Sequence, residues 1–206
     1  MKSYIHFIRH GLTEGNVKRW FYGWADVPLL QEGIAALNAL KEEGIYPVRG
    51  DADCYTSGML RTEQTFQTIY GDVEHKVIPS FKEMNFGDWE CKTFEEIKSE
   101  EGFDTWINDK TGATPYPGGD SIQSFYTRVQ RGLKELNGYH RLKELSHRHS
   151  GLNAVSIVVC HGGVISACMQ HMFPEVQGNF YDWIPDPGHG YTVYFEEGEP
   201  VSYEKI

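Results

Sequence analysis

Short apolar runs alternate along this chain with longer segments in which apolar residues recur at helical spacing. The runs predict β-strands at 3–9, 51–56, 74–79, 153–160 and 190–196, with a further strand near 200–205. The stretches at 5–8 and 155–159 are continuously apolar, which is typical of central strands buried on both faces. Strands that alternate with helices predict an α/β fold with a largely parallel sheet.

The helical spacing appears in four segments: 30–40, 57–69, 122–136 and one that opens at Gly162. Ser57 is expected to cap the second helix, and Asp120 or Ser121 the third. Side-chain oxygens of Ser and Asp accept hydrogen bonds from the free amides of a first helical turn.

Residues 84–119 are less regular than the rest of the chain. They hold Trp89, Phe94, Phe103 and Trp106, followed by the turn-rich stretch TGATPYPGGD. We expect one domain over residues 1–206, in which 84–119 is an insertion that covers a site at the sheet edge.

Length and charge narrow the class of protein. A chain of 206 residues, 40% of them hydrophobic, can bury a full core in one domain. A formal net charge of −10 argues against general binding to nucleic acid or a membrane surface, but it allows a local cationic pocket. The four cysteines form no C-x-x-C pair, and no signal peptide or membrane span is recognisable, so we expect a reduced, cytoplasmic protein.

Candidate chemistry gathers where predicted strands end. Arg9 and His10 follow the first strand, Arg61 follows the second, and His161 follows the strand at 153–160. The carboxyl ends of parallel strands meet at one sheet edge, so these side chains are expected to lie together. Arginine forks and helix N-termini bind phosphate oxygens, and a neutral histidine nitrogen can attack phosphorus. Two buried structural histidines are the alternative, but two strand ends that also carry arginines favour a phosphate pocket.

A covalent route through a phosphohistidine also needs a proton donor for the leaving alkoxide and a base for water. One carboxyl group can perform both tasks in turn. Glu83 follows the strand near 74–79 and has aromatic neighbours, which makes it the first candidate. Asp88 and Glu90 lie nearby, and either could point inward instead.

With these residues the chain resembles the histidine phosphatases, also called the phosphoglycerate mutase-like superfamily. RHGLTEGN matches the signature R-H-G-x-T-x-x-N of that family. Later family motifs follow in the same order: GWADVPL, SGMLRTEQT, KEMNFGDWE, PGGDS and VCHGG. The resemblance extends from Phe7 to about Gly163 and implies a three-layer α/β/α sandwich with a mostly parallel central sheet.

The resemblance also implies roles for individual residues. His10 resembles the nucleophile that becomes phosphohistidine, Arg9, Arg61 and His161 the residues that hold the phosphoryl oxygens, and Glu83 the proton donor. The residues expected to contact the substrate are Thr13, Asn16, Tyr22, Gly23 and Gly162. The family uses no metal for this chemistry, and no cofactor is expected.

A separate metal site is not predicted either. The stretch 139–151 carries His140, His147 and His149 beside several Lys and Arg residues. Histidines in such charged surroundings are more often solvated than metal-bound, so we interpret all three as surface residues.

The motifs favour a phosphatase over a mutase. The mutase motif has an arginine directly after the glutamate and two more in the following insertion. Here Met84 follows Glu83, and no arginine occurs before Gly118, so a second charged substrate group would lack bidentate partners. We expect a metal-independent phosphomonoester hydrolase for small molecules. A phosphoglycerate mutase and an inactive phospholigand-binding module are the alternatives, and a homodimer stays open.

Three residues depart from the family pattern. Leu30 replaces a threonine that caps a helix, Cys91 replaces a glycine, and Tyr22 is bulkier than the small hydroxyl residue of the mutases. The aromatic run RWFYGW predicts a substrate with apolar or ring character. Broad small-molecule phosphatases and α-ribazole phosphatase-like enzymes both share these motifs, which do not separate the two. Activity should be bell-shaped with a mildly acidic optimum, because His10 must start neutral and Glu83 protonated.

Overall fold

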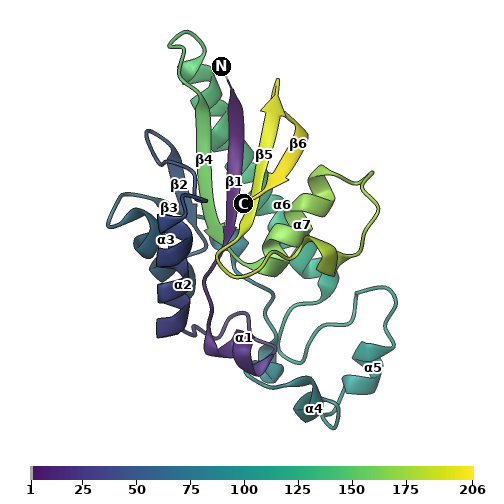
Figure 1. Cartoon of the computed structure of the whole chain (residues 1–206). Helices are drawn as coiled ribbons and strands as arrows, with labels where there is room; N and C mark the ends of the chain where they lie inside the picture. The colour runs from purple at the N-terminus through teal and green to yellow at the C-terminus, as the bar shows by residue number, and fades with distance from the viewer. Residues whose placement is uncertain (1) are drawn as a thin grey trace.

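A six-stranded sheet forms the middle of the computed structural model, which describes residues 2–206 (Figure 1). The strands are β1 (Ser3–Arg9), β2 (Asp53–Thr56), β3 (Lys76–Val77), β4 (Ala154–Cys160), β5 (Gly190–Glu196) and β6 (Glu199–Lys205). Their order is β3-β2-β4-β1-β5-β6, with β3, β2, β4 and β1 mutually parallel. β5 pairs antiparallel with both β1 and β6. The prediction of a mostly parallel sheet is therefore confirmed.

Helices cover both faces of this sheet. They are α1 (Glu14–Lys18), α2 (Gln31–Glu42), α3 (Leu60–Tyr70), α4 (Phe94–Ile97), α5 (Phe103–Ile107), α6 (Ile122–His147) and α7 (Gly162–Met172). The described residues also form the short 3₁₀ turns η1 (Pro79–Phe81) and η2 (Gly87–Trp89), between α3 and α4, and η3 (Phe180–Trp183), after α7. Within residues 2–206 no helix is both long and apolar enough to cross a membrane.

The alternation of side chains along β1 produces two separate cores. Ile5 and Phe7 join the cluster under α6 and α7, whereas Ile8 joins the cluster under α2 and α3. Because successive strand residues point to opposite faces, one buried strand supplies both clusters. The result is the expected α/β/α sandwich, and both central strands β1 and β4 are buried as predicted.

One predicted helix cap is wrong. α3 begins at Leu60, and its cap residue Met59 offers no side-chain acceptor. Asp26, from another part of the chain, instead accepts from the Leu60 amide at 2.7 Å. Ser57 lies before the helix, where its Oγ is 2.8 Å from Nε2 of His161. Ser121, by contrast, caps α6 in a capping box, as one of the two alternatives predicted.

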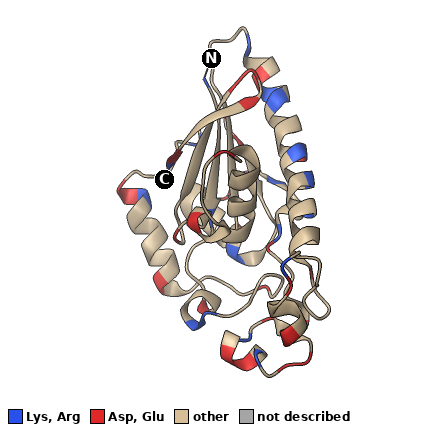
Figure 2. Ribbon diagram, turned by 90° about the vertical axis from the view of Figure 1, so that its right-hand side faces the viewer, with Lys and Arg blue, Asp and Glu red and all other residues tan. Residues whose placement is uncertain are grey.

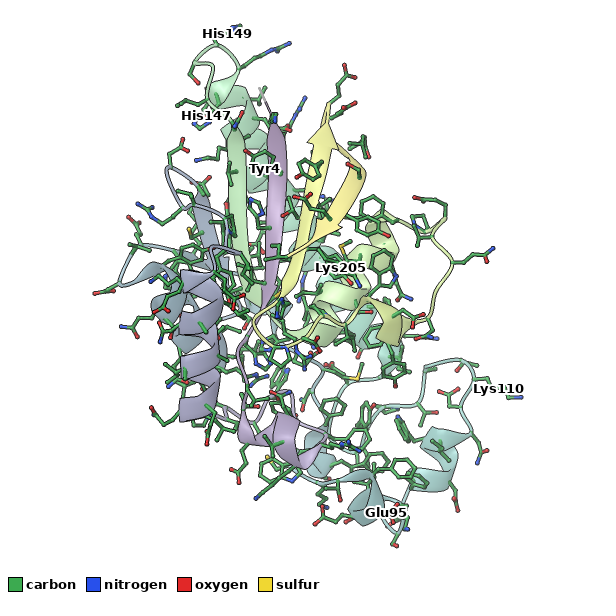
Figure 3. The ribbon with its side chains drawn as sticks, viewed as in Figure 1. Tyr4, Glu95, Lys110, His147, His149 and Lys205 are labelled. Carbon is green, nitrogen blue, oxygen red and sulfur yellow. The ribbon has the colours of Figure 1, made fainter. Side chains whose placement is uncertain are left out.

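Two further expectations need correction. The predicted strand at 74–79 is reduced to Lys76–Val77, which are exposed at the sheet edge. His140 is not a surface residue: it is 3% exposed on α6 and bonds to Ser3 and Ser156. His147 is the last residue of α6 and is half-buried, with Nδ1 2.9 Å from the Asn153 carbonyl oxygen. His149 is exposed just beyond α6, far from the end of the molecule that carries Glu95 (Figure 3).

The segment 84–119 and α1 lie beyond the carboxyl ends of the parallel strands (Figure 1). Aromatic rings hold this segment together, with Trp89 and Tyr116 at centroid distances of 5.3 and 5.1 Å from Trp106. Phe21, from the N-terminal part of the chain, packs against Trp106 at 6.2 Å. Charged residues are distributed unevenly over the molecule, and Lys and Arg recur along the long helix α6 (Figure 2).

Candidate active site

The carboxyl ends of β1 and β4 and the start of α3 converge on a cavity of about 550 Å³. Arg9, His10, Arg61 and Glu83 line it. His161 is fully buried directly behind the wall, with its ring centroid 5.3 Å from that of His10. The five side chains that the sequence placed at one sheet edge are thus close together in space.

His10 is held with one nitrogen free to react. Its Nδ1 lies 2.8 Å from the Gly11 carbonyl oxygen, which can only accept, so Nδ1 carries the proton. The lone pair is therefore on Nε2. Burial, followed by the charges of Arg61 and Arg9, holds the pKa of His10 well below 6.5, so the imidazole is neutral near pH 7.

Both arginines are anchored at one part of the guanidinium and unsatisfied at another. Arg9 donates from Nη1 to the Pro185 carbonyl at 2.7 Å. Arg61 donates from Nη2 to Gly23 O at 2.7 Å and from Nη1 to Ala25 O at 3.1 Å. In the described part of the chain, Nε of Arg9 and Nε of Arg61 are buried without a hydrogen-bond partner. Buried unpaired donors are costly, and a phosphoryl group in the cavity would satisfy them.

His161 adds a third donor or acceptor of this kind. It is the N-cap residue of α7, and its Nε2 lies 2.8 Å from Ser57 Oγ. Its Nδ1 is buried and has no partner among residues 2–206. Burial and the nearby Arg61, His10 and Arg9 lower its pKa well below 6.5, so this side chain is neutral too.

Glu83 faces the N-terminus of α7. Its Oε2 accepts from the Gly163 amide and its Oε1 from the Met84 amide, both at 2.9 Å. Gly163 has no room for a side chain, because a Cβ there would lie 2.5 Å from Glu83 Oε1. The main chain of Glu83 is fixed as well, since its carbonyl oxygen accepts from Arg128 at 3.1 Å and Trp24 at 3.0 Å.

The two other carboxylates considered for this role lie elsewhere. Asp88 is exposed and is not part of the cavity wall. Glu90 turns its carboxylate onto backbone amides, including those of Gly23 and Trp24 at 2.8 Å. Of the three candidates, Glu83 alone lines the cavity.

The expected substrate contacts divide into two groups. Asn16, Tyr22 and Gly162 line the cavity. Thr13 and Gly23 do not: Thr13 is buried beneath Tyr22, with Oγ1 2.8 Å from the phenolic oxygen, and Gly23 supplies its carbonyl to Arg61. Burial raises the pKa of Tyr22, so its hydroxyl stays protonated near neutral pH and can donate.

Aromatic side chains from four parts of the chain, residues 20–22, the segment 84–119, α6 and η3, form much of the remaining wall. They are Trp20, Phe21, Tyr22, Phe86, Trp106, Tyr116, Tyr126, Phe180 and Tyr181. Of the aromatic run RWFYGW, Trp20, Phe21 and Tyr22 line the cavity and Trp24 does not. Trp106 belongs to the segment that was expected to cover the site. Tyr126 on α6 and the residues around η3 were missed, because nothing in their local sequence shows that they approach the carboxyl ends of the strands.

Comparison with known proteins is consistent with this geometry. Residues 5–204 match the profile of the Histidine phosphatase superfamily (branch 1). An adenosylcobalamin/alpha-ribazole phosphatase of Salmonella typhimurium is 29% identical over 94% of this chain and 91% of its own length. The protein of that name from Escherichia coli is 32% identical over 79% of this chain and 75% of its own length.

A solved structure and a second group of relatives are also similar to this chain. The crystal structure of the alpha-ribazole phosphatase from Shigella flexneri matches with a TM-score of 0.75 and 24% identity, over 96% of this chain and 93% of that one. Bacterial 2,3-bisphosphoglycerate-dependent phosphoglycerate mutases are 27 to 34% identical, over 59 to 63% of this chain.

Proposed function

The chain belongs to branch 1 of the histidine phosphatase superfamily, and from this premise we propose that it hydrolyses small-molecule phosphomonoesters through a phosphohistidine on His10, without a metal ion. The observation that carries the proposal is the state of His10. Its imidazole is neutral, its Nε2 lone pair is free, and unsatisfied N–H groups of Arg9 and Arg61 lie in the same pocket. Such a pocket can hold a phosphoryl group against a nucleophile.

In the first step Nε2 of His10 attacks phosphorus and the bond from phosphorus to the ester oxygen breaks. The leaving oxygen takes a proton from Glu83, which becomes a carboxylate. Arg9, Arg61 and His161 surround the transferring group and stabilise the charge on its oxygens. Because those donors are already in place and buried, little reorganisation is needed as the charge shifts.

In the second step water attacks phosphorus and the bond to Nε2 breaks. The Glu83 carboxylate takes the proton of the attacking water and is ready to act again as an acid. His10 returns to its neutral state with the proton still on Nδ1, and inorganic phosphate leaves. No atom or electron has to be supplied from outside the substrate and water.

The wall of the cavity supports a leaving group with a ring. Planar aromatic side chains on several sides provide stacking surfaces for another planar group. The relatives named above as adenosylcobalamin/alpha-ribazole phosphatases are in keeping with that preference. We therefore propose phosphate esters of ring-bearing alcohols, with α-ribazole 5′-phosphate as the first substrate to test.

A phosphoglycerate mutase is the second candidate, since mutases are among the relatives. Along the described cavity wall the cations are Arg9, Arg61 and Arg19, and Arg19 is exposed at the rim. A bisphosphorylated acid needs more positive charge close to its second phosphate and its carboxylate. Phosphoryl transfer to a second hydroxyl that is faster than transfer to water would favour the mutase. An inactive binding module is disfavoured because His10 and Glu83 both line the cavity.

The test is hydrolysis of a chromogenic aryl phosphate in EDTA. The wild type should turn over, and His10→Ala should lose activity by about a thousandfold or more, because the nucleophile is gone. His149→Ala is the matched control, since His149 is exposed on the loop beyond α6. A quenched wild-type reaction should also contain an acid-labile phosphoryl adduct. Activity that persists in His10→Ala would refute the phosphohistidine route.

A further inference from the structure

Glu90 accepts an unusual number of backbone hydrogen bonds. Oε2 accepts from the amides of Gly23 at 2.8 Å and Ala25 at 3.1 Å, and Oε1 accepts from Trp24 at 2.8 Å and Phe86 at 2.9 Å. Three of these donors are consecutive residues, so the carboxylate fixes a whole loop. Charge-assisted bonds of this kind are among the stronger ones in proteins.

The loop that Glu90 fixes is also the loop that holds Arg61. Its amides point to Glu90, while the carbonyl oxygens of Gly23 and Ala25 accept from the two Nη atoms of Arg61. The guanidinium is fully buried, and its Nε is the donor left over. The peptide group between Gly23 and Trp24 bonds to both partners, its carbonyl to Arg61 and its N–H to Glu90, and so connects a carboxylate outside the cavity to a cation inside it.

The surroundings leave this loop little freedom to move independently. A Cβ on Gly23 would come within 1.6 Å of the Met84 carbonyl oxygen, so the loop lies directly against the residues that follow Glu83. Glu90 bonds to both sides of that contact, because Phe86 belongs to the second side. The Glu90 carboxylate therefore ties the loop that holds Arg61 to the segment that follows Glu83.

We propose that Glu90 is a positioning residue that sets the affinity of the site for a phosphoryl group by holding Arg61 through residues 23–25. The inference depends on the proposed function only in taking Arg61 as a phosphate ligand. Glu90 itself does not line the cavity and touches no reacting atom.

Replacement of Glu90 by glutamine keeps the size and shape of the side chain but removes its charge and one acceptor oxygen. An amide has one acceptor oxygen and an NH₂ group, so two of the four backbone donors would face another donor. The loop must then shift, and the carbonyl groups that orient Arg61 shift with it. Loss of hydrogen bonds at buried donors is costly enough to change phosphate affinity by about tenfold or more.

The experiment measures binding of inorganic phosphate by calorimetry, which needs no turnover. Glu90→Gln should weaken binding about tenfold or more. Glu95→Gln is the control, because Glu95 is exposed on α4 in the same segment and should bind phosphate like the wild type. All measurements are made well below the melting temperature of each variant.

A double-mutant cycle tests whether the effect passes through Arg61. In an Arg61→Lys background the planar fork that the loop carbonyls orient is gone, so Glu90→Gln should cause little further loss. Wild-type affinity in Glu90→Gln, or an equal loss in both backgrounds, would overturn the proposal.

A second variant covers the case in which Glu90→Gln does not fold. Glu90→Asp keeps the four acceptor positions, but the side chain is one methylene shorter and its oxygens lie farther from the backbone amides. Its phosphate affinity should therefore lie below that of the wild type. Wild-type affinity in Glu90→Asp would then refute the proposal. If coupling is seen while His10→Ala still hydrolyses esters, the proposed function fails and the role of Glu90 stands.

Discussion

The Gly11 carbonyl oxygen decides which nitrogen of His10 can react. It accepts from Nδ1, and this leaves Nε2 with a lone pair to which no group in residues 2–206 donates a hydrogen bond. Burial lowers the pKa of His10 most, and the positive charges of Arg61 and Arg9 lower it further, so the imidazole stays neutral. In the proposed mechanism the same two arginines therefore bind the phosphoryl group and help to keep the nucleophile neutral.

This coupling predicts the acid side of the pH profile. The pKa of His10 is held well below 6.5, so protonation should not remove the nucleophile until the pH is far under that value. Arg61→Gln removes a cause of the lowered pKa, and its acid limb should lie at higher pH than that of the wild type. The measurement is kcat/KM of both proteins from pH 4 to pH 8. An acid limb that stays in place would contradict the role of Arg61 in keeping His10 neutral.

For individual residues, the sequence predicted which side chains meet at the ends of strands, but it did not predict the contacts made by loops. His10 and His161 could be placed together because parallel strands end at one edge. The bonds from Glu90 to residues 23–25 depend on the conformation of a loop without repeating pattern. From the sequence, Glu90 was one of several acidic residues near Glu83, and its role became visible only with the backbone amides in place.

Among the elements, helix ends were harder to predict than helix interiors. The apolar spacing located α2, α3, α6 and α7, because a helix that buries one face carries apolar residues at helical spacing in its own sequence. The start of α3 was misplaced, since its first amide is satisfied by Asp26, which is 34 residues away. Ser57 had the right chemistry for a cap, but its hydroxyl is used by His161 instead.

The start of α2 offers a direct test of cap chemistry. Leu30 is the N-cap residue and has no side-chain hydrogen bond to the first turn. Its side chain belongs to neither hydrophobic cluster described above, so little packing is lost by replacing it. Leu30→Thr should raise the free energy of unfolding by about 0.5–1 kcal/mol, because threonine can accept from a free amide. Urea unfolding measures this, with Leu30→Ala as the control that lacks an acceptor. Equal stability of the two variants would show that the cap adds nothing.

Across the whole molecule, four buried histidines link folding to pH. His10 and His161 lie at the cavity. His6 lies in β1 and His140 on the buried side of α6, and burial lowers the pKa of each to about 4. His6 bonds to Thr192 through Nδ1, and His140 bonds to Ser3 and Ser156. These neutral bonding arrangements are present in the folded chain and lost on unfolding.

The sign of the effect follows from proton binding. Above pH 6.5 these histidines are neutral in both states and contribute no pH dependence. Between pH 6.5 and 4 the unfolded chain binds protons that the folded chain excludes, so stability falls as the pH falls. For His140 alone the loss over this window should reach about 3 kcal/mol, since each pKa unit corresponds to about 1.4 kcal/mol.

Urea unfolding between pH 7 and pH 4.5 tests this, with His140→Gln as the informative variant. Glutamine can still bond to the neighbouring serines but cannot take up a proton, so its unfolding free energy should fall less steeply with acid than that of the wild type. His149→Ala should keep the wild-type slope, because His149 is exposed. An identical slope in His140→Gln and the wild type would mean that His140 is not a source of the acid sensitivity. A shallower slope would separate the acid stability of the fold, which depends partly on His140 of α6, from the acid limb of the reaction, which the proposed mechanism assigns to His10.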